Sequence, residues 1–127
     1  MIFQHTAPWV LDRSPHTGEP KTQTRRPAKH GDRFVMVGDL LGAERHDRLL
    51  YLTDETYSIQ PGRGKRALGR FRLRGIRYVV RADFISEADA RAEGFESPDA
   101  FRQIWVQLYG LTALEQPCYA LTIDLVK

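Results

Sequence analysis

One stretch limits the possible folds of this 127-residue chain more than any other, and it spans residues 67–81, ALGRFRLRGIRYVVR. Before Gly75, apolar residues alternate with arginines, and after it the alternation resumes one step out of phase. Alternation with a period of two predicts a strand that buries one face. A shift of one residue at a glycine predicts a β-bulge, which keeps the apolar side chains on that face. The expected buried face comprises Phe71, Leu73, Ile76, Tyr78 and Val80.

Other short apolar runs predict further strands. The runs 34–37, 49–53 and 56–59 favour strands, and we expect the first of them, FVMV, to be buried. Residues 118–126 alternate apolar and smaller or polar residues, as a strand with one buried face does. Residues 38–62 are otherwise hard to assign.

Two helices are expected between these strands. Ser86 begins the first as its cap, with Asp89 as the capping-box partner and Gly94 as the stop signal. The second begins at Ser97-Pro98 and ends at Gly110. Its apolar face, which we expect to pack on the core, comprises Ala100, Phe101, Ile104, Trp105 and Leu108.

Short strands around one or two helices predict an α+β domain with a small, curved, barrel-like sheet. The length suits a single domain over residues 1–127. The single cysteine, Cys118, permits no internal disulfide and would be a buried, inert thiol at the start of a strand. No apolar run approaches the roughly 18 residues that span a bilayer, and no signal peptide is evident. We therefore expect a soluble, cytoplasmic protein.

Charge is unevenly distributed along the chain. Residues 62–81 hold eight of the basic residues and no acid, residues 21–33 hold five cations and one acid, and acids gather in residues 83–99. A positive surface of this kind attracts polyanions, although a solvated basic face is the simpler interpretation. The four histidines lack the spacing of metal ligands, so we expect no metal and no cofactor. Neither a P-loop nor a G-x-S-x-G motif is present.

The segment KTQTRR, residues 21–26, places a lysine, two threonines and two arginines together. In a helical turn or tight loop, Lys21 and Thr24 would face the same way. A threonine hydroxyl becomes a nucleophile only if a base takes its proton. Lysine is such a base only when burial or neighbouring cations depress its pKa. No acid lies nearby in the sequence to assist, so these residues alone favour a basic loop that touches phosphate or solvent.

Several motifs occur in an order that resembles the ASCH domain family. They are KTQTRRP, GDR, ALGRFRLRGIR, ISEADARAEGF, a helix ending in WVQLYG, and a last strand YALTIDLV. The resemblance covers roughly residues 18–127 and implies a fold like the PUA domain, a small β-barrel with flanking short helices and a cleft on one side. The segment HTAPWVLDRSPHTGEP and the long, polar segment 38–62 depart from the compact branch of the family. The chain looks closer to its larger, bacteriophage-like members.

The resemblance also implies candidate functions. One bacterial branch resembles an amidohydrolase that removes the acetyl group from N4-acetylcytidine, and its catalytic set matches Lys21, Thr24 and Glu93 here. Another member of the family has been described as a ribonuclease, which we rank lower. Since Glu93 beside Lys21 would raise the pKa of the lysine, burial would have to outweigh it if Lys21 is to act as a base.

Three functional hypotheses follow. The first is a module that binds RNA or a modified nucleoside in a basic cleft, through residues on the first box and on the arginine-rich strand. The second is amidohydrolysis of N4-acetylcytidine or a related acylated nucleoside by Lys21, Thr24 and Glu93. The third is a protein-interaction module that uses the 97–110 helix or the acidic stretch. The sequence leaves the oligomeric state open. The ligand-binding residues expected under the first hypothesis are Lys21, Thr22, Arg25, Arg26, Arg70, Arg72 and Arg74.

Overall fold

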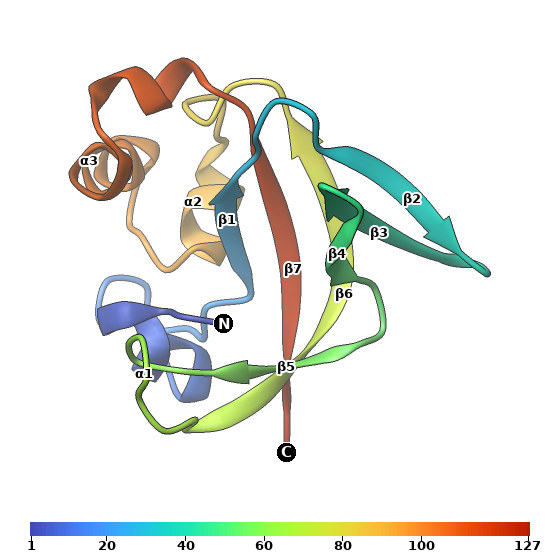
Figure 1. Ribbon diagram of the computed structural model, residues 1–127. Coiled ribbons are helices and arrows are strands. Elements are labelled where there is room, and N and C mark those ends of the chain that lie inside the picture. Colours follow the sequence, from blue (N-terminus) through green and yellow to red (C-terminus); the bar gives the residue numbers. More distant parts are fainter.

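A curled antiparallel sheet forms the centre of the computed structural model, which describes all residues 1–127 (Figure 1). Its four strands run in the order β1-β7-β6-β5, and a second sheet of three strands has the order β2-β3-β4. The α+β class is confirmed, with a half-barrel in place of a closed barrel. The strands are β1 (Gln23–Pro27), β2 (Arg33–Val37), β3 (Leu40–Arg45), β4 (Arg48–Leu52), β5 (Thr56–Ile59), β6 (Gly69–Val79) and β7 (Cys118–Val126).

Short helices flank the sheet. In Figure 1, α2 and α3 lie on one side of β1 and β7, while the β2–β3 hairpin extends away on the other side. None of the helices is both long enough and apolar enough to cross a membrane. The helices are α1 (Ala7–Leu11), α2 (Glu87–Ala92) and α3 (Pro98–Tyr109), with 3₁₀ turns η1 (Gln4–Thr6) and η2 (Leu111–Glu115).

The predicted bulge in β6 is confirmed. The register against β7 shifts between Leu73 and Gly75, which leaves Arg74 as the extra residue. Phe71, Leu73 and Ile76 are buried on one face, as the alternation predicts. The expected burial of Tyr78 and Val80 is wrong, because these side chains are 46% and 61% exposed.

Val79 is buried in their place, since the end of β6 passes from one core to another. The first core lies in the curl of the sheet and includes Phe71 and Leu73. The second core lies between the sheet and the helices and includes Val79, Phe101 and Trp105. The strand β7 contributes Tyr119, Leu121 and Ile123 to the first core and Cys118 and Ala120 to the second. The first half of β7, residues 118–121, is therefore buried on both faces, and this strand joins the two cores.

The remaining predictions have mixed outcomes. Both helices occur where expected, with Ser86 and Ser97 as side-chain caps and Gly110 after the end of α3. The run 34–37 is a strand, but its expected burial is wrong, because most of β2 lies exposed on the hairpin that projects from the sheet. The segment 38–62 contains an additional strand, β3, that the pattern did not reveal.

Candidate functional site

A cavity of about 280 Å³ opens between the N-terminal segment, β1, the end of α2 and α3. Half of its lining is apolar, with the rings of Phe3, Phe95, Phe101 and Trp105 among the wall residues. Its polar residues include Lys21, Thr24 and Glu93, which the structure brings together. An apolar cavity with a few convergent polar groups is the usual form of a small-molecule site.

Lys21 and Glu93 meet at this cavity although 72 residues separate them in the chain. The Lys21 Nζ atom donates to the Glu93 backbone oxygen at 2.8 Å and to its Oε1 at 3.4 Å. The two side chains are only 4% and 3% exposed. The acid that the local sequence around Lys21 lacks is thus supplied by a distant helix.

The end of α2 positions Glu93 at the cavity. Glu93 directly follows this helix, and Gly94 then turns the chain at φ +98°. The backbone N–H of Thr22 donates to the Ala92 oxygen, which holds the helix end against the residue beside Lys21. The Arg25 N–H donates to Glu93 Oε1 at 3.1 Å. The Oε1 atom of Glu93 therefore accepts from Lys21 Nζ and from the β1 backbone at Arg25, while its Oε2 atom is buried without a partner.

Burial dominates the electrostatics of this pair. Removal from water lowers the pKa of Lys21, and the positive charge of Arg26 lowers it further, while Glu93 acts in the opposite direction. Burial likewise raises the pKa of Glu93, against the influence of Lys21 and Arg25. Both shifts favour the neutral amine and the neutral acid. Burial thus outweighs the raising effect of Glu93, which the sequence could not decide.

Thr24 lies in β1 with its side chain buried at the cavity. The basic loop expected for this box is wrong over most of its length, because residues 23–27 form a strand antiparallel to β7. Alternate residues of a strand share a face, so Thr24 and Arg26 point to the same side. The Thr24 hydroxyl makes no hydrogen bond within the chain, and Lys21 Nζ bonds to Glu93 instead of to this hydroxyl.

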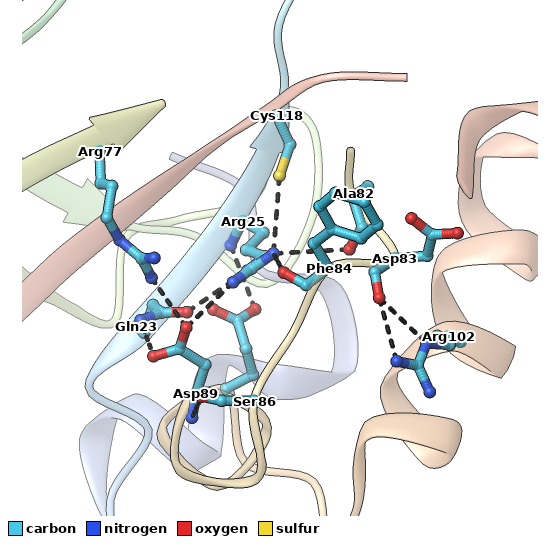
Figure 2. A network of polar contacts seen from close by, with 11 residues as sticks. Gln23, Arg25, Arg77, Ala82, Asp83, Phe84, Ser86, Asp89, Arg102 and Cys118 are labelled. Atoms are coloured by element: carbon cyan, nitrogen blue, oxygen red, sulfur yellow. Dashed lines mark hydrogen bonds and ion pairs between the residues drawn. The ribbon is translucent and has the colours of Figure 1, made fainter. Parts of the chain in front are cut away.

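Arg25 points away from that face and has a structural role (Figure 2). Its guanidinium donates to the Asp89 carboxylate at 3.1 Å and to the backbone oxygens of Ala82 and Phe84 at 3.4 and 3.1 Å. Arg77 reaches the same Asp89 oxygen from β6. These contacts bind β1 to the 82–86 segment and to α2, so the Arg25 guanidinium is already occupied by the protein.

Arg26 is in a different situation. It lines the cavity, its Nε atom is buried without a hydrogen-bond partner, and its guanidinium carbon lies over the Phe3 ring at 5.1 Å from the centroid.

The other expected ligand-binding residues lie away from this cavity. Thr22 is exposed and faces a shallow surface depression with Pro20 and Ala88. Arg70 and Arg72 of β6 donate to Thr56 and to the Asp54 backbone oxygen. Arg74 pairs with Asp124 at 3.2 Å. The structure therefore brings Lys21, Thr24, Arg26 and Glu93 together but places the arginine strand elsewhere.

Sequence reasoning missed two walls of the cavity. One is the N-terminal segment from Ile2 to Thr6, where Gln4 adopts φ +46°. The other is the face of α3 that carries Phe101 and Trp105, because the apolar spacing that indicates core packing also fits a cavity wall. For Arg26, the signal was available: once the box is assigned as a strand, alternation separates it from Arg25.

The chain contains no group of three or more His, Cys, Asp or Glu side chains that could hold a metal ion. Cys118 is buried at the start of β7, as predicted, and burial raises the pKa of its thiol to about 11. Comparison with models of protein families, with characterised proteins and with solved structures finds no match. Any function must therefore be argued from the cavity and from the motifs themselves.

Proposed function

We propose that this chain is an ASCH-type domain with a PUA-like fold, whose cavity binds an acylated nucleoside and hydrolyses its amide bond. The observation that carries the proposal is the buried contact of Lys21 with Glu93 beside Thr24. Strongly perturbed ionisable groups in a cleft are typical of active sites. The half-barrel with helices along one side is consistent with the PUA-like fold.

The chemistry would proceed through an ester on Thr24. The Thr24 oxygen attacks the acyl carbon while the neutral Lys21 amine takes its proton. The bond from carbon to nitrogen then breaks, and Glu93 in its protonated form gives its proton to the leaving amine. A water molecule, deprotonated by the Glu93 carboxylate, hydrolyses the ester, and Lys21 returns its proton to Thr24. Lys21 must turn from Glu93 toward the hydroxyl for the first step.

The size of the cavity supports a single small ligand. Its volume of about 280 Å³ lies just below the range of roughly 300–1,000 Å³ for drug-sized ligands. The aromatic wall suits the flat face of a heterocyclic base. Glu93 Oε2 has no partner in the chain, so in the protonated acid its O–H would donate to the nitrogen of the scissile amide.

The direct test is turnover of N4-acetylcytidine and a small panel of acylated nucleosides. We expect the wild type to release the free amine, and we expect Lys21→Ala, Thr24→Ala and Glu93→Ala to lose this activity. Thr122→Ala is a matched control, because Thr122 is an exposed residue on β7 outside the cavity. Absence of hydrolysis by the wild type, or full activity of Thr24→Ala, would refute the mechanism.

RNA binding is a second candidate because the basic segment 63–66 forms no ion pairs with acidic side chains of the chain. Arg63, Lys65 and Arg66 are exposed and form no ion pair with any carboxylate. Elsewhere the opposite charges meet, since Asp89 and Asp83 pair with arginines of the basic stretches. If about five cations contact single-stranded RNA, the logarithm of affinity should fall with the logarithm of salt at a slope near −3.5. A slope near zero would exclude binding through the RNA backbone.

A further inference from the structure

Arg26 carries hydrogen-bond donors that the protein leaves without acceptors. Its side chain donates no hydrogen bond and forms no ion pair within the chain, and its Nε atom is buried. The other two cations of the cavity wall are satisfied, Lys21 by Glu93 and Arg25 by Asp89. Buried donors in native proteins nearly always have a partner, and the buried Nε–H of Arg26 has none. Its Nη atoms are not buried, so they can reach a molecule in the cavity. The missing acceptor at Arg26 therefore points to a ligand.

The position of Arg26 suits recognition at the reacting end of the cavity. Its guanidinium carbon lies 5.1 Å from the centroid of the Phe3 ring, and Phe3 is fixed in the first core. A guanidinium over an aromatic ring keeps its edge donors free for a second partner. Because Thr24 and Arg26 share one face of β1, those donors lie on the same side of the strand as the Thr24 hydroxyl.

The charge of Arg26 is also unbalanced. Glu93 is the only carboxylate among the cavity-lining residues, and it already accepts hydrogen bonds from Lys21 and from the Arg25 N–H. The positive charge of Arg26 acts on its neighbours: burial lowers the pKa of Lys21 and Arg26 lowers it further, while burial raises the pKa of the Tyr109 hydroxyl and Arg26 opposes that rise. A carbonyl oxygen would satisfy the donors but leave this charge uncompensated. An oxyanion would satisfy both, because the planar fork of arginine matches two oxygens of a carboxylate or phosphate.

We infer that the cavity binds an anionic ligand, whose carboxylate or phosphate oxygens accept hydrogen bonds from the Arg26 guanidinium. The inference rests on the proposed function in treating this cavity as the ligand site. It narrows the substrate class to acylated compounds that carry an oxyanion, such as an acylated nucleoside monophosphate in place of the neutral nucleoside.

The test compares ligands that differ in this charge. Chemical-shift titrations of isotope-labelled protein, in low-salt buffer free of phosphate, would measure the affinities of benzoate against benzamide and of cytidine 5′-monophosphate against cytidine. The first pair tests a carboxylate and the second a phosphate. We expect at least one anion to bind roughly tenfold or more tightly than its neutral partner, since hydrogen bonds to charged groups are the stronger ones. Equal affinity within both pairs would overturn the inference.

Variants of Arg26 test whether this residue causes the preference for the anionic ligand. Arg26→Gln should lose the preference for the anion, and Arg26→Lys should keep part of it, because lysine retains the charge without the fork. Arg48→Gln is the matched control, since Arg48 is an exposed arginine of β4 outside the cavity with no ion pair. A preference that survives in Arg26→Gln would overturn the inference. Thermal unfolding checks the fold. Arg26→Gln loses the contact with the Phe3 ring but no hydrogen bond, so we expect a decrease in stability of only about 0.5–1 kcal/mol.

Ligand binding can be measured without turnover, so the hydrolase proposal and the anion-binding inference can fail independently of each other. An anion preference that depends on Arg26, in a protein that hydrolyses nothing in the acyl panel, would refute the hydrolase and support this inference. Hydrolysis of neutral acylated nucleosides with equal affinity for anionic and neutral ligands would support the hydrolase and refute this inference.

Discussion

The Arg25 guanidinium donates to the Asp89 carboxylate across 3.1 Å, and this contact fixes the helix that ends before Glu93 (Figure 2). The backbone N–H of the same Arg25 donates to Glu93 Oε1. One residue of β1 therefore holds α2 by its side chain and the carboxylate of the site by its backbone. The position of Glu93 in the site therefore depends on this double attachment.

Arg25→Gln should destabilise the protein strongly. The Arg25 side chain is 0% exposed, and its loss leaves the oxygens of Ala82 and Phe84 without their donor. Removing one partner of a fully buried ion pair costs about 3–5 kcal/mol. Because Asp89 is 25% exposed and keeps its contact with Arg77, we expect a decrease in the free energy of unfolding of about 2–3 kcal/mol. Urea unfolding measures it.

Arg77→Gln is the control, because Arg77 contacts the same Asp89 oxygen from a side chain that is 56% exposed. An exposed pair is worth about 0–1 kcal/mol. Equal losses in the two variants would show that the buried network around Arg25 does not hold α2.

Thr24→Val should leave the fold intact. The Thr24 side chain is buried at the cavity and its hydroxyl makes no hydrogen bond in the chain, so valine of the same shape loses no contact. We expect the free energy of unfolding to stay within about 0.5 kcal/mol or to rise, while turnover of an acylated nucleoside is lost. Thr53→Val serves as comparison, because its hydroxyl donates to the Leu41 oxygen at 3.0 Å and its loss should cost about 1 kcal/mol. A large loss of stability in Thr24→Val would indicate a structural role for the hydroxyl.

The elements with strong local patterns were predictable. The bulged strand β6 and the capped helix α3 follow from side-chain periodicity, which depends on neighbours along the chain. The exposure of Phe34 and of Tyr78 was not predictable in this way. Their patterns resemble those of core residues, but burial depends on whether another element covers that face, and the β2–β3 hairpin is left uncovered.

The site was only partly predictable for the same reason. Lys21 and Thr24 could be selected from their chemistry, but their partner Glu93 is 72 residues away and entered only through the family resemblance. Local sequence also could not separate Arg25, which the Asp89 network occupies, from Arg26, which is free at the cavity. That distinction depends on β1 being a strand with two different faces.

Asp32 should make stability depend on pH. Arg45 donates two hydrogen bonds of 2.8 Å to its carboxylate, and the Tyr119 hydroxyl donates a third at 3.0 Å. The Arg45 contact holds the pKa of Asp32 well below its usual value. Because the folded pKa is lower than the unfolded one, the carboxylate stabilises the fold above the unfolded pKa, and this contribution is lost as the pH falls.

Asp32→Asn should therefore cost most near neutral pH, and the difference from wild type should shrink as the pH falls from about 5 to about 2. Urea unfolding at several pH values measures this difference. Asp124→Asn, which removes an exposed partner of Arg74, should cost less than about 1 kcal/mol at neutral pH. A cost of Asp32→Asn that does not vary with pH would show that the charge of Asp32 is not the source of its contribution.

Gly94→Ala tests how closely the site depends on the turn after α2. Gly94 has φ +98°, and a Cβ atom there would lie 2.6 Å from Cε3 of the Trp9 ring. Gly110→Ala is a matched control, because Gly110 has φ +94° but open space around the position of a Cβ. Both substitutions carry the backbone strain of an L-residue at positive φ, which is about 1 kcal/mol or more. Only Gly94→Ala adds a clash with a ring, which must move or displace the adjacent Glu93.

We therefore expect Gly94→Ala to lose at least about 1–3 kcal/mol more than Gly110→Ala in the free energy of unfolding, the usual cost of overpacking. We also expect Gly94→Ala to weaken ligand binding in the cavity, since Trp9 packs on Phe95 of the cavity wall at 5.4 Å between ring centroids. Gly110→Ala should bind ligand like the wild type. Equal stability of the two variants would mean that Trp9 relaxes away from the new methyl group without cost, and that Glu93 is positioned by the β1 contacts alone.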